Sequence, residues 1–448
     1  MLELKAAKEI KGTIQTPPSS DLFFLSMTIA AATGCRATIS PVTPTPRIVA
    51  WVNAFARHLD ITFENDRCTC LSRALEPGVL LTLDYTTVPY RDFIVFLLLG
   101  HFGTVRFSAL PLQRFALWKK RAEKLGCTLE NNDSDGIAEV SLGRRDHFHI
   151  PDVIPDPEDV LLYLGLGMGL KKSISFTTDY VVSNPLRQVL PAFGWECSVK
   201  SSSRSNNADP LARRLRFLTK GKKNETPQQF FITADFSKPS LEQADILLPG
   251  DDVFAALMVT SKCLVAKGSL VIANVCLESW NTSVISLVRS MGSNVSIQET
   301  HTTSFGSAGT VVVQKFNPVG RKVECSPNFQ YVFQLPAMVV TAAFAQGQTV
   351  LRGLEDLRLD EPDGIETINA CIDALGARYG EMPDGIVVQG ARQFDGFDVQ
   401  TVLPAHCAGA FAVAGLKCRG TTTINDDDLL QRWPDFYSLL SSICEFKE

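Results

Sequence analysis

The sequence predicts an α/β fold of two domains, each built from three repeated helix-strand-helix-strand units with the helices inside and the sheets outside. Three observations lead to this prediction. The chain has 448 residues, more than one ordinary hydrophobic core accommodates. An apolar, helix-like run that closes near glycine and passes into a β-rich strand recurs six times. A polar stretch containing proline separates the third copy from the fourth, so we expect three units on each side.

The six copies of this run set the period of the chain, and a missed repeat would misassign the whole fold. They occupy residues 27–40, 93–109, 160–178, 257–275, 339–354 and 409–424. A second, amphipathic helix and another strand follow most of them, at 51–64, 118–130, 187–199, 286–297 and 368–381. Glycines in the "GLGMGL" run (165–170) indicate a close contact between two helices.

The segment 365–375 shows the helix period most clearly. Ile365, Ile368, Ile372 and Leu375 fall on one helix face, and Gly376 is placed to end the helix in a left-handed conformation. We therefore expect a helix that buries this face and stops at Gly376.

The domain boundary is predicted in the long gap between the third and fourth copies. Residues 200–229 and 237–250 are polar and contain proline, and 200–223 hold eight basic residues against one acid. We expect one domain at 19–244 and a second made of 1–18 with 245–448. The basic insert could bind a phosphorylated ligand or an acidic partner, but a solvated hairpin is the favoured interpretation because it lacks interleaved aromatic residues.

Composition excludes several function classes. Charged residues make up 20% of the chain and the net charge is −5, so we expect no nucleic-acid partner. The N-terminus is charged, and the longest apolar runs are far shorter than the ~20 residues that span a bilayer, so we expect a soluble, cytoplasmic protein without a membrane segment. The twelve scattered cysteines are expected to be reduced core residues. The expected partner is a small molecule or another protein, with no cofactor.

Three acids, Asp360, Glu361 and Asp363, crowd the start of the helix at 365–375. Around Pro362 the aspartates suit a helix N-terminus, where carboxylates complement the helix dipole. A carboxylate beside a cleft could instead act as a general acid or base if burial raised its pKa. We interpret the aspartates as capping residues and leave both roles open for Glu361.

Two further groups carry possible chemistry. His147, His149 and Asp152 could bind a metal, but such spacing is common by chance and we expect no metal site. His406 begins an apolar helix, where it is either a buried core histidine or a cleft residue. Cys407 beside it could be a nucleophile, since a helix N-terminus lowers the pKa of a thiol.

Four stretches together resemble the 5-enolpyruvylshikimate-3-phosphate (EPSP) synthase family, an enolpyruvyl transferase family, over nearly the whole chain. They are "IKGTIQTPPSSDLFFLSMTIAAATG" (10–34), "LLPGDDVFAAL" (247–257), residues 337–377 and residues 403–440. The resemblance implies the inside-out, two-domain α/β fold of these enzymes. It also implies transfer of a carboxyvinyl group from phosphoenolpyruvate to a phosphorylated shikimate in a cleft that closes between the domains.

Few positions of this chain match the site residues of the EPSP synthase family. Glu361 and His406 match the family and are the candidate catalytic residues, while Arg91 is a candidate substrate-binding residue in "YTTVPYR" (85–91). Ser20 and Asp21 are further substrate-binding candidates, because they occupy the positions of a family lysine and serine.

Other family positions depart from the pattern. Basic residues of the family fall at Leu25, Gly364, Cys407 and near Gln431, and a catalytic aspartate falls at Phe333 or Gln334. The family's phosphate-binding helix start reads "IPDPEDVLL" (154–162) here, with three acids. Anionic substrates need basic partners in a closed cleft. We therefore expect a neutral to acidic cleft and a family member that is not an efficient EPSP synthase. The alternatives are a genuine shikimate-pathway transferase with a rearranged site and a non-catalytic partner protein.

Overall fold

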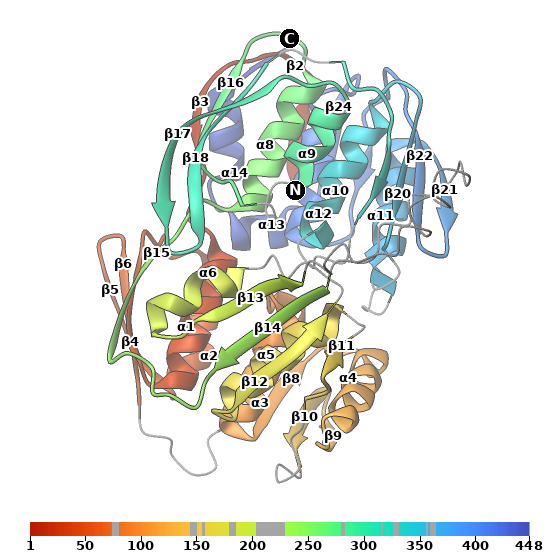
Figure 1. Ribbon diagram of the computed structural model, residues 1–448. Helices are drawn as coiled ribbons and strands as arrows, with labels where there is room; N and C mark the ends of the chain where they lie inside the picture. Colours follow the sequence, from red (N-terminus) through yellow and green to blue (C-terminus); the bar gives the residue numbers. More distant parts are fainter. Residues whose placement is uncertain are drawn as a thin grey trace, which may run out of the picture.

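The computed structural model (Figure 1) describes most of the 448 residues. The described residues are 1–73, 80–143, 150–154, 157–178, 185–202, 229–278, 283–314, 317–325, 331–354, 357–358 and 364–447.

Three four-stranded sheets of one topology form the lower half of the molecule in Figure 1. In each sheet, one edge strand runs parallel to its neighbour, and the other neighbouring strands pair antiparallel. The parallel edge strand is given first in the three spatial orders that follow. In spatial order the strands of the first sheet are β15 (Gln243–Leu247), β4 (Arg36–Ser40), β6 (Arg67–Ser72) and β5 (Leu59–Glu64). The second sheet contains β7 (Leu81–Asp84), β8 (Thr104–Ser108), β10 (Ile137–Leu142) and β9 (Leu129–Ser134). The third contains β11 (Val153–Ile154), β12 (Ser173–Thr178), β14 (Gln229–Asp235) and β13 (Cys197–Ser202).

The upper half repeats this pattern, with a reduced third sheet. The fourth sheet contains β3 (Gly12–Gln15), β16 (Leu270–Cys276), β18 (Gly306–Val313) and β17 (Val295–Thr303). The fifth contains β19 (Lys322–Glu324), β20 (Gln348–Arg352), β22 (Gly385–Gln389) and β21 (Arg378–Met382). The sixth contains β1 (Leu2–Lys5), β24 (Thr421–Ile424) and β23 (Asp398–Val399), while β2 (Ala7–Ile10) pairs with β25 (Cys444–Phe446).

The first helix of each unit lies inside its half of the molecule. The lower interior helices are α1 (Ser20–Thr33), α3 (Arg91–Phe102) and α5 (Pro157–Gly169), and the upper ones are α8 (Asp252–Leu264), α10 (Tyr331–Ala343) and α12 (Ala405–Gly415). These helices are buried along most of their length, as expected for helices that are apolar all round. The predicted α/β fold, with helices inside and sheets outside, is confirmed.

The other described helices are partly exposed and follow or flank the interior ones. They are α2 (Pro46–Phe55), the 3-10 helix η1 (Tyr85–Thr87), α4 (Leu112–Lys124), α6 (Pro185–Val189), the 3-10 helix η2 (Leu190–Phe193), α9 (Ser283–Ser290), α11 (Gly364–Leu375), α13 (Asp427–Arg432) and α14 (Phe436–Ile443). The α11 helix ends where its sequence predicts, because Gly376 has a φ of 74°. Its predicted apolar face is buried.

Glycines allow α3 and α5 to pack with their backbones in contact. A Cβ atom on Gly165 would lie 2.2 Å from the carbonyl oxygen of Phe93, and one on Gly169 would lie 2.4 Å from that of Leu97. Real side chains do not tolerate such distances, so only glycine fits. The helix contact predicted from the "GLGMGL" run is confirmed.

Two separate hydrophobic cores underlie the two halves. One draws on residues 22–248 with Cys276 and Phe305, and the other on 2–14 and 253–443. We propose that these cores correspond to the two predicted domains. The boundary that we propose lies a few residues after the predicted one, because β15 runs to Leu247 and pairs with β4 along its whole length.

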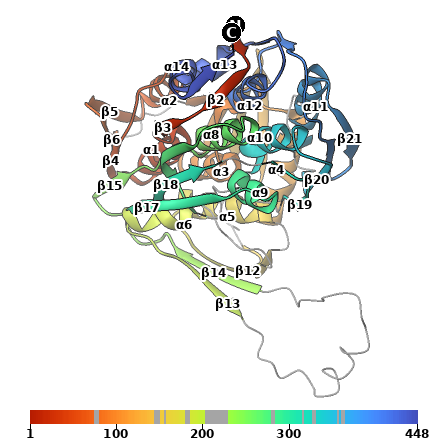
Figure 2. The same cartoon turned by 90° about the horizontal axis from the view of Figure 1, so that it is seen from above.

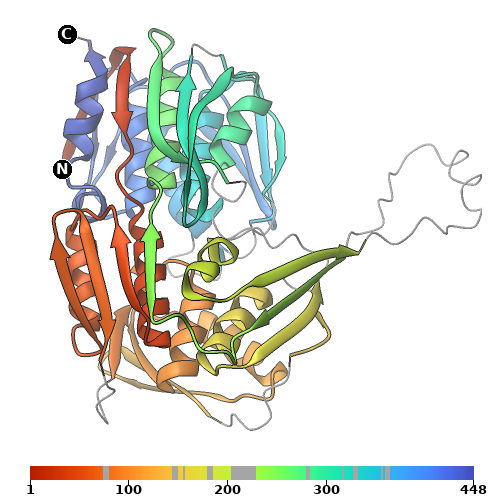
Figure 3. The ribbon, with the colours of Figure 1, turned by 60° about the vertical axis from the view of Figure 1, so that its left-hand side comes forward.

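The hairpin β13–β14 carries the ends of the polar insert. Its strands pair antiparallel from Cys197 to Ser202, opposite Ala234 to Gln229. Figures 2 and 3 show both strands side by side and pointing away from the rest of the molecule. Residues 203–228 lie outside the described residues, so the solvated hairpin predicted for 200–223 stays a prediction.

Candidate active site between the two halves

A cleft of about 350 Å³ lies between the two halves of the molecule. Both halves contribute to its described lining, which mixes charged, hydroxyl and apolar side chains. The lining residues are Asp21, Arg47, Thr86, Thr87, Pro89, Arg91, Phe333, Leu357, Gly364, Thr367, Ile368, Val402, Leu403, Pro404, His406, Cys407, Asp428 and Arg432.

The chain crosses between the halves twice, and the two crossings lie side by side. Pro18 and Gly250 form an isolated antiparallel bridge, and the backbone N–H of Ser19 donates to Pro249 O over 3.0 Å. Helix α1 follows its N-cap Ser19, and α8 follows its N-cap Asp251, which accepts from Phe254 N. Serine and aspartate are favoured N-caps because their side chains satisfy free backbone N–H groups. Both helices therefore begin at the junction.

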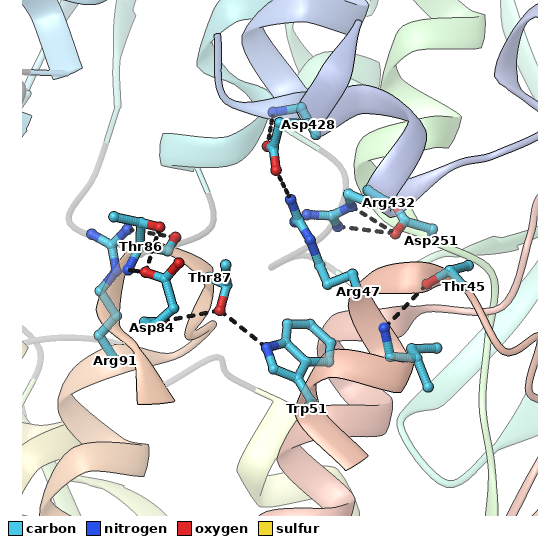
Figure 4. A network of polar contacts seen from close by, with 12 residues as sticks. Thr45, Arg47, Trp51, Asp84, Thr86, Thr87, Arg91, Asp251, Asp428 and Arg432 are labelled. Atoms are coloured by element: carbon cyan, nitrogen blue, oxygen red, sulfur yellow. Dashed lines mark hydrogen bonds and ion pairs between the residues drawn. The ribbon is translucent and has the colours of Figure 1, made fainter. Parts of the chain in front are cut away.

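Arg432 from α13 binds a carboxylate at each crossing (Figure 4 shows the Asp251 arm). Its Nη2 lies 2.8 Å from Asp21 Oδ2 and 2.9 Å from Asp251 Oδ2. The Arg432 residue is 2% exposed. Burial alone lowers its pKa, but Asp21 and Asp251 outweigh that effect and raise the pKa above its ordinary value. The guanidinium therefore stays charged, and its Nε and Nη2 atoms donate to Asp21 and Asp251.

A second ion pair crosses the cleft farther from the crossings. Arg47 Nη2 lies 2.7 Å from Asp428 Oδ1, and the backbone N–H of Ala405 donates to Asp428 Oδ2 over 2.6 Å (Figure 4). Arg47 is set in place by the start of α2, where Thr45 caps the helix and Pro46 occupies its first position. Asp428 thus supplies a carboxylate to an arginine and to the N-terminus of α12.

Arg91 begins α3 on the lower side of the cleft. Its guanidinium carbon lies 4.6 Å from the centroid of the Tyr85 ring, and its Nη2 donates to Thr86 O at 3.4 Å. Asp84 shapes this turn by accepting from the backbone N–H of Thr86 at 2.9 Å, and Trp51 Nε1 donates to Thr87 Oγ1 at 3.1 Å (Figure 4). The turn holds Arg91 at the cleft and presents two threonines there.

His406 lies on the upper side of the cleft, in the first turn of α12. Its ring meets that of Phe333 edge-on, with 5.2 Å between centroids. Burial and then Arg432 lower the pKa of His406 to about 3. The imidazole is therefore neutral at pH 7 and acts as a hydrogen-bonding group or weak base, not as an anion-binding cation.

Asp252 follows the N-cap Asp251 as the first residue of α8, and its carboxyl is shifted toward the protonated form. Burial, followed by the neighbouring Asp251, raises its pKa to about 7. Gln334 Nε2 donates to Asp252 Oδ2 at 2.9 Å, while Gln334 Oε1 accepts from Val284 N at 3.1 Å. Asp252 does not belong to the described cleft lining, so it is not placed to touch a ligand there.

Cys407 follows His406 and lines the cleft, but its thiol is not activated. Burial, followed by Cys371 and Asp428, raises the pKa of Cys407 well above its usual value. The expectation that the start of α12 lowers this pKa is wrong, because the loss of hydration outweighs the helix dipole. All twelve cysteines are free, and eleven of them are buried.

A known protein family matches the C-terminal half of this chain. Residues 215–440 match the family EPSP synthase (3-phosphoshikimate 1-carboxyvinyltransferase). This match covers half of the chain. The chain belongs to the EPSP synthase family. The 3-phosphoshikimate 1-carboxyvinyltransferase of Carboxydothermus hydrogenoformans is 30% identical over 203 residues, which are 45% of this chain and 47% of the relative. That of Chloroflexus aggregans is 32% identical over 44% of this chain and 46% of the relative.

The matches to curated members of the EPSP synthase family thus span about half of their length. Solved structures extend the likeness of fold to the whole chain. EPSP synthase from Acinetobacter baumannii superimposes with a TM-score of 0.70 over 100% of both chains at 17% sequence identity. The enolpyruvyl transferase NikO from Streptomyces tendae gives a TM-score of 0.66 at 14% identity, over 99% of this chain and 98% of its own.

Three of the residues suggested by the resemblance to EPSP synthases meet at the cleft. Asp21, Arg91 and His406 all belong to the lining. Ser20 does not: its side chain is buried, and its hydroxyl has no hydrogen-bond partner among the described residues. Glu361 lies outside the described residues, as do Asp360 and Asp363. The roles of all these residues remain predictions.

Sequence reasoning missed three charged residues of the cleft, Arg47, Arg432 and Asp428. Arg432 stands one position after Gln431, where the resemblance places a family lysine, so inspecting the neighbouring position would have found it. Arg47 and Asp428 carry no such signal. The expectation of a neutral to acidic cleft is wrong for the described lining, where three arginines face two aspartates. Folding brings in Arg47 from a segment that the motif comparison did not cover, and it places Arg432 at the cleft one residue away from the expected position.

At the acidic start of α5, Asp159 has a structural role. Asp159 is 1% exposed, and its Oδ1 lies 3.0 Å from Nε of Arg121 in α4. Asp159 therefore pairs with a neighbouring helix and does not line the described cleft. Asp156 lies outside the described residues.

Membrane and metal features were also sought within the described ranges. None of the helices there has the length and apolar character needed to cross a bilayer. No group of three or more His, Cys, Asp or Glu residues is arranged to hold a metal ion in the same part of the chain. His147 and His149 lie outside it.

Proposed function

We propose that this chain is an EPSP synthase-family protein whose interdomain cleft has lost most of its capacity for anions and which is not an efficient EPSP synthase. One observation supports this proposal: two of the three arginines in the described lining are bound to carboxylates of the protein itself. Arg47 pairs with Asp428, and Arg432 pairs with both Asp21 and Asp251.

The charge of the substrates makes this pairing decisive. Phosphoenolpyruvate and shikimate 3-phosphate each carry a phosphate and a carboxylate, and burying these groups is costly unless basic side chains neutralise them. The described lining has a formal surplus of one positive charge, because three arginines face two aspartates. His406 adds no charge at pH 7, since its pKa is lowered to about 3. Such a cleft suits a ligand with at most one or two negative charges.

The shape of the cleft agrees with a small ligand. A space of about 350 Å³ falls near the lower end of the usual range for small-molecule pockets. Its apolar side chains include Phe333, Ile368 and Leu403, and Thr86 and Thr87 add hydroxyl groups. We infer a compact, partly apolar molecule with hydroxyl groups and few charges as the preferred class. Arg91 and His406 are the proposed contacts on the two sides of the cleft.

A second candidate function is a genuine carboxyvinyltransferase of the shikimate pathway with a rearranged site. The presence of Arg47, Arg91 and Arg432 in one cleft favours it, because these are residues of the type that such substrates require. This candidate requires Asp428 or Asp21 to leave its arginine when substrate enters. A non-catalytic role beside a protein partner is the remaining alternative.

Steady-state turnover decides between these candidates. Phosphate release is measured with phosphoenolpyruvate and shikimate 3-phosphate, both at millimolar concentration, with the Carboxydothermus hydrogenoformans enzyme as the positive control. We expect turnover far below about 1 s⁻¹, which is at the low end for ordinary enzymes. Turnover above that value would refute the proposal and establish the rearranged transferase. Calorimetric titration of each substrate separates absent binding from absent chemistry.

A further inference from the structure

The junction between the two halves holds a buried charge cluster, which enters the proposed function only because it occupies one arginine of the cleft. Asp21, Asp251 and Arg432 are 6%, 0% and 2% exposed. Asp21 stands in the first turn of α1 and Asp251 caps α8, so both carboxylates lie at helix N-termini beside the crossings. Arg432 comes from α13, more than 180 residues later than either of them.

We propose that Arg432 is a clamp that keeps the two halves closed whether or not a ligand is bound. Its guanidinium joins a lower carboxylate, Asp21, to an upper one, Asp251, with N–O distances of 2.8 and 2.9 Å. Arg432 also lines the cleft, so it lies on the cleft side of the crossings. A hinge motion that opens the cleft at the crossings moves α13 away from α1 and breaks the Asp21 contact.

Burial makes this contact expensive to break. Removing one partner of a buried ion pair leaves a charge without compensation, and such changes are strongly destabilising. Two further contacts fix the members of the clamp. Asp251 also accepts from Phe254 N at 2.9 Å, and the Arg432 guanidinium carbon lies 4.8 Å from the ring centroid of Trp433. The geometry of Arg432 is therefore held in place before any ligand arrives.

The Arg47–Asp428 pair adds a weaker link across the same cleft. Its side chains are 10% and 29% exposed, compared with 2% and 8% for Arg432 and Asp21. Exposed pairs contribute little because water screens them. We assign the closed arrangement chiefly to Arg432. Ligand-driven closure, in which bound anions draw two domains together, is then unnecessary for this chain.

Small-angle X-ray scattering of the full chain tests the clamp. The ligand-free wild type is expected to match the scattering curve calculated from this structure, with no shift in radius of gyration on adding millimolar phosphoenolpyruvate and shikimate 3-phosphate. The Asp21→Asn variant removes the lower arm and leaves Arg432 paired with Asp251, so its radius of gyration should increase. Asp60→Asn, which removes an exposed carboxylate that pairs with Arg73 inside the lower half, is the matched control and should leave the curve unchanged.

Two results would overturn the clamp. One is a ligand-free wild type that is more extended than this structure. The other is a folded Asp21→Asn variant whose curve equals that of the wild type. If Asp21→Asn does not fold, the triple variant Asp21→Asn, Asp251→Asn and Arg432→Gln removes all three charges of the cluster and so leaves none of them unpaired, and it must still show the expanded curve. None of these readouts requires turnover, so the clamp and the proposed function can fail separately.

Discussion

The change Asp428→Asn tests whether the protein's own carboxylate keeps anions out of the cleft. Asparagine retains the shape of the side chain and an oxygen for the backbone N–H of Ala405, but it removes the negative charge that now lies 2.7 Å from Arg47. The formal net charge of the described lining then rises from +1 to +2. Arg47 becomes available to an incoming carboxylate or phosphate.

The expected gain in anion affinity follows from the position of the Arg47–Asp428 pair. Two unit charges about 4 Å apart interact by about 4 kcal/mol at an effective dielectric constant of about 20. The Asp428 side chain is 29% exposed, and an incoming anion must also give up its water, so we expect about one third of that energy to remain. A gain of about 1.4 kcal/mol corresponds to about tenfold tighter binding.

Calorimetric titration with phosphoenolpyruvate at constant ionic strength measures this gain. Asp427→Asn is the matched control, because it makes the same change of charge at an exposed position in the same helix. We expect about tenfold tighter binding for Asp428→Asn and no more than a twofold change for the control. Equal affinities for Asp428→Asn and the wild type would show that Asp428 does not limit anion binding and would refute the reasoning.

Three further predictions concern stability. Gly165→Ala should lower the melting temperature markedly, since its Cβ would lie 2.2 Å from Phe93 O, whereas Gly380→Ala, with open space around it, should not; equal shifts would contradict the packing argument. The pKa of Asp252 is raised to about 7, so the fold favours the protonated side chain. The stabilisation from this preference is complete below about pH 4 and is lost as pH rises through 7. Asp252→Asn should therefore gain stability relative to the wild type between pH 5 and pH 8 in urea unfolding, and a constant difference would argue against it. The pKa of His406, lowered to about 3, means that the wild type loses stability as pH falls below about 6.5, so His406→Gln should show a shallower loss from pH 7 to pH 4.

The sequence alone was sufficient for the fold, because the signals that specify it are local. The repeated apolar runs and the glycines after them lie within a few residues of one another, so their periods can be read directly. Gly376 ends α11 through its own positive φ, and Gly165 marks a helix contact through the absence of its own side chain. For the same reason Arg91 and His406 could be assigned to the cleft, since each begins an interior helix in a segment that resembles the family.

The charge of the cleft was decided only by the tertiary structure. Arg47 and Asp428 are 381 residues apart in the sequence, and Arg432 and Asp21 are 411 apart. No periodicity links such positions. Arg432 stands one residue after the family's lysine position, so sequence comparison alone does not recognise it until the fold places its side chain at the cleft. Asp159 illustrates the converse, because its acidic surroundings suggest a cleft residue until α4 places Arg121 against it. Ion pairing depends on distances of a few ångströms between side chains, and those distances exist only once the two halves have folded and met.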